Sequence, residues 1–126
     1  DGSWMSIFDL ELMDRNSFPF EEGKIQINPN REFQILPQAI GGTVNMVSGS
    51  ESSIERLQKK YPEIQVESME GAAAAYVSKQ FNIPLIQVRG ISNYVEPRNK
   101  SNWQLEKAID AVGKVVLEMV EAMATT

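Results

Sequence analysis

The feature that most constrains the fold is an alternation of strand-like and helix-like segments, which begins near Gly41 and continues to the end of the chain. Short apolar runs bounded by Gly, Pro or polar residues predict strands, and apolar residues spaced three and four apart predict helices. The expected order is strand 41–48, helix 50–60, strand 64–68, helix 70–81, strand 84–92 and helix 105–123. This order is typical of a parallel sheet covered by helices. The sequence therefore predicts an α/β fold.

The chain of 126 residues is long enough for one domain and shows no internal repeat. Residues 1–37 are rich in turn-forming residues and are expected to be a loop-rich lead-in, whereas residues 38–126 carry the alternation. Helix 70–81 is expected to turn Ala73, Ala74, Val77 and Phe81 inward. The last helix carries an apolar stripe of Leu105, Ala108, Ile109, Val112, Val115, Val116, Met119, Val120 and Met123.

Composition excludes several classes of chemistry. The chain has neither His nor Cys, so a Ser-His-Asp triad, a thiolate nucleophile and the usual zinc ligands are ruled out. Its net charge is -5 and its basic residues are scattered, which argues against nucleic-acid binding. There is no apolar run of the roughly 20 residues that a membrane span needs and no visible signal peptide, so a cytoplasmic location is the expectation. No metal and no cofactor is expected.

Two short motifs lie where predicted strands end: Ser68-Met69-Glu70-Gly71-Ala72 and Arg89-Gly90-Ile91-Ser92-Asn93. The ends of parallel strands are where an α/β protein presents side chains to a ligand. An ionised Glu70 is a pure acceptor that can hold two neighbouring hydroxyl donors, such as those of a ribose. The alternative is that Glu70 is only an acid in the first turn of a helix, where acids are common.

Asn93 offers a carbonyl acceptor and an NH2 donor in one plane. A 6-oxopurine presents an acceptor at its oxo group and, as it leaves a sugar, a donor at ring nitrogen 7, so an amide complements both. The alternative is that Asn93 only tolerates a turn after a strand. Arg89 interrupts an apolar run and is expected to be structural, pairing with Glu70, Glu67 or a part of the fold outside this chain.

The two motifs and the intervening GAAAAYVSKQFNIPLIQVRGISN resemble the C-terminal half of the nucleoside phosphorylase and nucleosidase family, in particular its futalosine hydrolase branch. The resemblance covers essentially the whole chain. It implies a three-layer α/β/α fold of which residues 1–126 are the C-terminal portion. It also implies that Glu70 binds the ribose hydroxyls, that Met69 packs on the sugar and that Asn93 is catalytic by stabilising the departing base. Trp103 would face the 5′ substituent; the alternative is that this Trp anchors the last helix to the core.

The implied activity is hydrolysis of a purine nucleoside, with futalosine giving hypoxanthine and dehypoxanthine futalosine in menaquinone biosynthesis. Family members that act on adenine nucleosides typically carry Asp at the position of Asn93, so Asn favours hypoxanthine. A nucleoside phosphorylase and a non-catalytic nucleoside-binding fragment are the alternatives. The resemblance places the water-activating acid outside this chain and favours a homodimer. Val47 and Ser48 are candidates for base stacking, and Arg98 or Lys100 for a carboxylate on the 5′ group.

Overall fold

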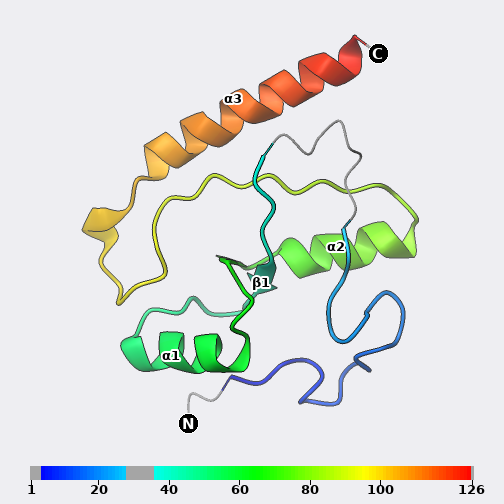
Figure 1. Cartoon of the computed structure of the whole chain (residues 1–126), viewed down its shortest axis with the longest axis vertical. Helices are drawn as coiled ribbons and strands as arrows, with labels where there is room; N and C mark the ends of the chain where they lie inside the picture. Colours follow the sequence, from blue (N-terminus) through cyan, green and yellow to red (C-terminus); the bar gives the residue numbers. More distant parts are fainter. Residues whose placement is uncertain (1–3, 28–35, 126) are drawn as a thin grey trace.

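The computed structural model describes residues 4–27 and 36–125. The elements are β1 (Gly41–Thr43), α1 (Glu51–Lys60), β2 (Val66–Ser68), α2 (Gly71–Gln80), the 3-10 helix η2 (Lys100–Asn102) and α3 (Leu105–Ala124). In Figure 1, β1 lies between α1 and α2, and the long helix α3 lies at the end of the molecule opposite α1. The order of the helices and of the first two strands follows the prediction, although the first strand, expected over 41–48, ends at Thr43. Residues 4–27 form turns, as expected of the lead-in.

The sheet is parallel, as the alternation predicts. β1 pairs with β2 in a register that sets Gly41 opposite Val66 and Thr43 opposite Ser68. A Cβ on Gly42 would lie 2.6 Å from Cδ1 of Ile64, so a larger residue here would displace the Ile64 side chain. Together with the helices between and after the strands, this pairing confirms the α/β class.

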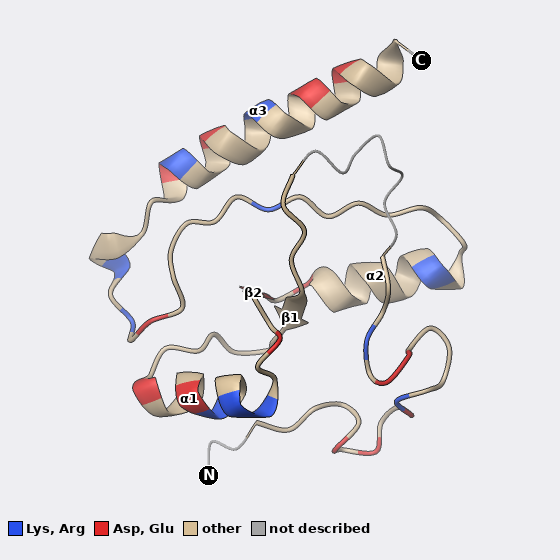
Figure 2. Ribbon diagram, viewed as in Figure 1, with Lys and Arg blue, Asp and Glu red and all other residues tan. Residues whose placement is uncertain are grey.

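Local sequence signals explain the bounds of α1. Ser50 accepts the backbone N–H of Ser53, and the Ser53 hydroxyl accepts the N–H of Ser50, which forms a reciprocal cap. Figure 2 shows acidic residues in the first part of α1 and basic residues in its last turn, an arrangement that complements the helix dipole. Ile54 and Leu57 are buried, so α1 is an amphipathic helix with one packed face.

The lead-in is attached to both α1 and α2. The Trp4 indole N–H donates to the carbonyl of Ser53 at 3.1 Å, and the Lys60 ammonium bonds both the Trp4 carbonyl and the Asp9 carboxylate. Phe20 is buried and packs against Tyr76 of α2, with ring centroids 5.9 Å apart. These contacts attach the lead-in to α1 and to α2.

The inward face predicted for α2 is wrong. Ala75 is the buried residue of this helix, whereas Ala73, Ala74 and Val77 are exposed and Phe81 is 72% exposed. Helix α2 contacts β1, and Phe20 packs on its Tyr76. The described residues leave Ala73, Ala74, Val77 and Phe81 uncovered, so these apolar side chains face solvent.

The third predicted strand, at 84–92, is also not formed. This segment is extended but makes no backbone ladder with a described strand. It runs between α2 and α3 (Figure 1), held by side chains at one end and by a close approach to α3 at the other. A segment of strand-like sequence needs a neighbouring strand to pair with, and the described part of the chain supplies none.

Helix α3 matches its predicted range to within one residue, yet only Ala108 and Met119 of its stripe are buried. A Cβ on Gly90 would overlap the carbonyl oxygen of Ala108 and lie 2.9 Å from its carbonyl carbon. The backbone of the extended segment therefore touches the helix directly. No described helix is long and apolar enough to span a bilayer.

Candidate functional site

The first motif forms the junction between β2 and α2. Glu70 is the N-cap residue of α2, but its side chain makes no capping hydrogen bond. The hydroxyl of Thr43, at the end of β1, accepts the N–H of Ala72 at 2.7 Å instead. Since Thr43 satisfies this helix N–H, the exposed Glu70 carboxylate is left without a hydrogen-bond or ion-pair partner among the described residues. Its acceptor oxygens are available to a ligand.

The second motif is brought beside the first by Gln87, a residue that the sequence analysis did not single out. The Gln87 amide N–H donates to the carbonyl of Gly71 at 2.8 Å, and its carbonyl oxygen accepts from the Arg89 guanidinium at 2.8 Å. The expectation that Arg89 pairs with Glu70 or Glu67 is therefore wrong within the described residues. An amide can donate and accept at once, so Gln87 connects the helix start to the guanidinium. A polar residue inside an apolar run was the signal available for it.

Asn93 is half-buried and its amide is engaged locally. Its Oδ1 accepts the hydroxyl of Ser92 at 2.6 Å, and its Nδ2 donates to the carbonyl of Tyr94 at 2.8 Å. Both bonds are to the residues directly before and after Asn93. An amide nevertheless has a second N–H and a second lone pair, so Asn93 retains one donor and one acceptor for a ligand.

The start of α3 is fixed to the second motif. The Gln104 N–H donates to the Ser92 carbonyl at 2.7 Å, so the residue before α3 is joined to the residue before Asn93. Trp103 precedes Gln104, caps η2 through its N–H and is 37% exposed. Trp103 is neither buried as a core anchor nor fully exposed, and part of its ring is free for contact. Met69 is 47% exposed.

A loop after β1 bonds to β2, just before the first motif, and to the segment that follows the second motif. Ser48 N–H donates to Oε1 of Glu67 at 3.0 Å, and the Gly49 carbonyl accepts the N–H of Arg98 at 3.1 Å. Ser48 itself is 6% exposed, which removes it as a base-stacking surface in this arrangement, whereas Val47 is exposed. The loop 44–50 is thus bonded to Glu67 of β2 on one side and to Arg98 on the other.

The site has one free carboxylate, a partly available amide and a half-exposed indole on connected segments. No hydrogen bond or ion pair joins the side chains of Glu70 and Asn93, and their link runs through Gly71, Gln87 and the extended segment. The arrangement can accept hydroxyl donors at one end and read an acceptor–donor edge at the other. Among the described residues, no group of three or more Asp or Glu side chains is placed to hold a metal ion.

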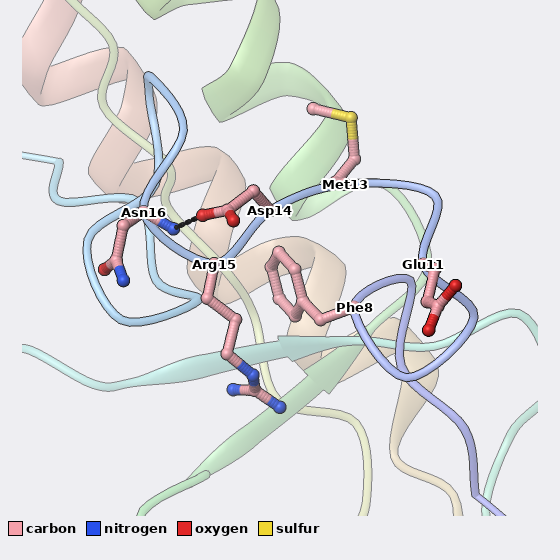
Figure 3. A pocket seen from close by; sticks show the side chains of 6 residues that line it. All are labelled: Phe8, Glu11, Met13, Asp14, Arg15 and Asn16. Atoms are coloured by element: carbon pink, nitrogen blue, oxygen red, sulfur yellow. Dashed lines mark hydrogen bonds between the residues drawn. The ribbon is translucent and has the colours of Figure 1, made fainter.

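Two hollows of the described surface lie away from the motifs. One of about 490 Å³ is lined by Phe8, Glu11, Met13, Asp14, Arg15 and Asn16 of the lead-in. Figure 3 shows the Phe8 ring between Arg15 and Glu11, with Asp14 accepting the N–H of Asn16. A smaller apolar groove of about 220 Å³ lies between the extended segment and α3. Neither contains a residue of the two motifs, so the motifs alone identify the candidate site.

Comparison with known proteins identifies relatives. A futalosine hydrolase from Streptomyces coelicolor is 31% identical over 77 residues, which is 58% of this chain and 33% of that protein. A second, from Acidothermus cellulolyticus, is 32% identical over 76 residues, or 59% of this chain and 31% of that protein. A 5'-methylthioadenosine/S-adenosylhomocysteine nucleosidase from Desulfotalea psychrophila is 34% identical over 73 residues, or 56% and 31%.

The chain spans about a third of the length of these curated relatives. No solved structure matches it at a significant level. The sequence model of the phosphorylase superfamily matches residues 30–123, a range that includes both motifs and all the regular elements except the final residue of α3. The chain therefore belongs to the phosphorylase superfamily.

Proposed function

We propose that this chain supplies the ribose- and base-binding portion of a purine nucleosidase, and that the full-length protein hydrolyses futalosine to hypoxanthine and dehypoxanthine futalosine. The observation that carries the proposal is the uncommitted carboxylate of Glu70 at the start of α2. Because Thr43 accepts the helix N–H, Glu70 is not needed as a cap and can bind vicinal ribose hydroxyls. The similarity to futalosine hydrolases supports the same substrate class.

In the proposed reaction, the bond between the ribose carbon and ring nitrogen 9 of the purine breaks and water adds to the ribose. Glu70 holds the hydroxyls as positive charge develops on the sugar, and Met69 packs on the sugar. Asn93 donates to the oxo group of hypoxanthine and accepts from ring nitrogen 7, which is protonated as the base leaves. Trp103 lies against the 5′ substituent. The acid that activates water belongs, in this proposal, to a part of the protein outside residues 1–126.

A second candidate is an adenine-releasing nucleosidase, favoured by the 34% identity to the methylthioadenosine/S-adenosylhomocysteine enzyme. The residue that separates the two is Asn93. Its amide can donate to an oxo group, but it lacks the carboxyl proton that would protonate departing adenine. The hypoxanthine-releasing activity is therefore the primary proposal.

The test is to incubate the full-length protein with futalosine, inosine and methylthioadenosine, each with and without inorganic phosphate, and to identify the released base by chromatography. Release of hypoxanthine from futalosine without phosphate is the expected result. A strict requirement for phosphate would make the protein a phosphorylase. Binding of nucleosides without turnover would make it a binding protein, and either result would contradict the proposal.

A further inference from the structure

The loop that follows β1 is held to β2 at both ends. Val44 N–H donates to the Ser68 carbonyl at 2.8 Å, one residue beyond the ladder, and Ser48 N–H donates to the Glu67 side chain at 3.0 Å. Val44 and Ser48 are 5% and 6% exposed, whereas Met46 between them is 73% exposed. The loop therefore has two buried anchors and a projecting apex, and one of its anchors is a carboxylate.

Glu67 is an unusual anchor. Oε1 accepts the Ser48 N–H, but Oε2 is inaccessible to water and has no hydrogen-bond partner among the described residues, and neither does the buried hydroxyl of Ser48. Burying unpaired polar oxygens costs stability, which an apolar side chain at this position would avoid. The hydrogen bond from the Ser48 N–H to Oε1 offsets part of this cost.

The same loop also contacts the segment that follows Asn93. The Gly49 carbonyl accepts the Arg98 N–H at 3.1 Å, and a Cβ on Gly49 would lie 3.7 Å from Cβ of Arg98. Glu67 is in β2, from which the chain continues directly to Glu70. A succession of contacts therefore runs from the β2–α2 junction through Glu67, Ser48 and Gly49 to the loop beyond Asn93.

From this succession we infer that Glu67 is a positioning residue: through Ser48 it sets the placement of the loop 44–50, and thereby of the Asn93 segment relative to Glu70. The inference rests on the proposed function, since it concerns the separation of the ribose-binding and base-binding groups of one nucleoside pocket. Glu67 itself does not touch the nucleoside. Its carboxylate holds a backbone N–H, so any side chain with an acceptor at the same reach performs the same task in part.

The test compares Glu67→Ala, Glu67→Gln and Ser48→Ala in the full-length protein, with Glu55→Ala as the charge-matched control on the exposed face of α1. Amide hydrogen exchange of the loop reports the tether directly. Glu67→Ala is expected to speed exchange of the Ser48 amide by at least about tenfold, because opening of the loop governs that exchange. Glu67→Gln keeps an acceptor and is expected to restore most of the protection. Ser48→Ala keeps the N–H and is expected to behave like the wild type.

The kinetic readout separates positioning from general loss of structure. A misplaced loop raises KM for the nucleoside, here by on the order of tenfold, and also lowers kcat because Asn93 is displaced from the departing base. Partial unfolding lowers kcat in proportion to the folded fraction and leaves KM unchanged. The expected order of KM is Glu67→Ala well above Glu67→Gln, with Ser48→Ala and Glu55→Ala near the wild type.

Unchanged exchange of the Ser48 amide in Glu67→Ala would overturn the inference, as would a KM that rises as much in Ser48→Ala. If Glu67→Ala does not accumulate as folded protein, Glu67→Gln and Ser48→Ala carry the comparison, and loss of loop protection in Ser48→Ala overturns it. A wild-type protein that releases no base from any purine nucleoside would refute the proposed function, and the exchange data would then decide alone whether Glu67 holds the loop.

Discussion

Replacing Gly90 and Gly113 by Ala is the same chemical change, and the structure predicts effects of opposite sign. A Cβ on Gly90 would overlap the carbonyl oxygen of Ala108 and lie 2.9 Å from the carbonyl carbon, whereas a Cβ on Gly113 would meet nothing within 4 Å. The obstacle at Gly90 is backbone of α3, which cannot rotate away as a side chain can. Gly113 is exposed in the middle of the same helix.

The magnitudes follow from these contacts. Carbon atoms pack at about 3.5–4.0 Å, so Ala at 90 forces the extended segment and α3 apart by roughly 1 Å. Overpacking of this kind costs about 1–3 kcal/mol, against a gain of about 0.4–1 kcal/mol from the less flexible unfolded chain. We therefore expect Gly90→Ala to lower the free energy of unfolding by about 1–2 kcal/mol. Gly113→Ala is expected to raise it by about 0.8–1 kcal/mol, because Ala is the better helix former.

Urea unfolding of the two variants and the wild type, followed by far-ultraviolet circular dichroism, checks both signs. With a urea dependence of about 1–3 kcal/mol per molar, the two midpoints should differ by roughly 0.6–3 M. A midpoint for Gly90→Ala at or above that of the wild type would refute the close approach of the segment to α3. A fall for Gly113→Ala would show that this face of α3 is covered in solution.

Four further outcomes are expected. Glu70→Gln replaces one acceptor oxygen by a donor and should lower kcat/KM of the full-length protein about tenfold, a loss of roughly 1.4 kcal/mol, with ribonucleosides losing more than 2′-deoxy substrates. Asn93→Asp should shift base release from hypoxanthine toward adenine, by the roughly 1–3 kcal/mol that a mismatched buried hydrogen bond costs, as measured by competition between inosine and adenosine. The hydrogen bond from Lys60 holds the pKa of the Asp9 carboxyl well below its ordinary value of 3.8. The hydrogen bond between Lys60 and Asp9 therefore contributes its full stabilisation above pH 3.8, and this stabilisation is lost as the pH falls through the lowered pKa of Asp9. Fluorescence of Trp4 should follow that loss in the wild type but not in Lys60→Met. Finally, the 126-residue chain alone should be inactive, because the proposed water-activating acid lies outside it. It should also self-associate in light scattering, since its accessible surface of 9784 Å² exceeds the roughly 6,700 Å² of a compact monomer of its mass. A clean monomer at high concentration would contradict the second expectation.

Local signals in the sequence were sufficient to predict where helices α1 and α3 begin and end. The cap at Ser50 and the long periodic stripe from Leu105 act within a few residues of one another, so α1 and α3 lie where they are expected. Burial was not predictable in the same way. Val77 and Phe81 have the spacing of a packed face, but the face is packed only if another element covers it. The segment 84–92 has strand composition, but a strand also requires a partner strand.

The candidate site shows the same division between local and long-range information. The position of Glu70 at the start of α2 followed from the order of elements. The cap from Thr43 joins residues 29 positions apart, and the bond from Gln87 to Gly71 joins residues 16 apart, so neither leaves a local signature. Asn93 was expected at a strand end; that strand is not formed, and the Asn93 amide instead bonds its neighbours Ser92 and Tyr94.

Helix α3 is attached to the rest of the described chain by fewer contacts than those that join β1, β2 and α2. The β1–β2 pair and α2 are knit by a backbone ladder and the Thr43 cap, so the Glu70 end belongs to a unit that opens together. Helix α3 is joined to the rest by the Gly90 approach, the bond from Gln104 to Ser92 and one shallow apolar groove. Detachment of α3 is therefore expected at a lower free energy than opening of the β1–β2 unit. Amide hydrogens of α3 should then exchange with solvent sooner than those of β2 and α2, while the bond from Arg98 to Gly49 still holds the segment beyond Asn93.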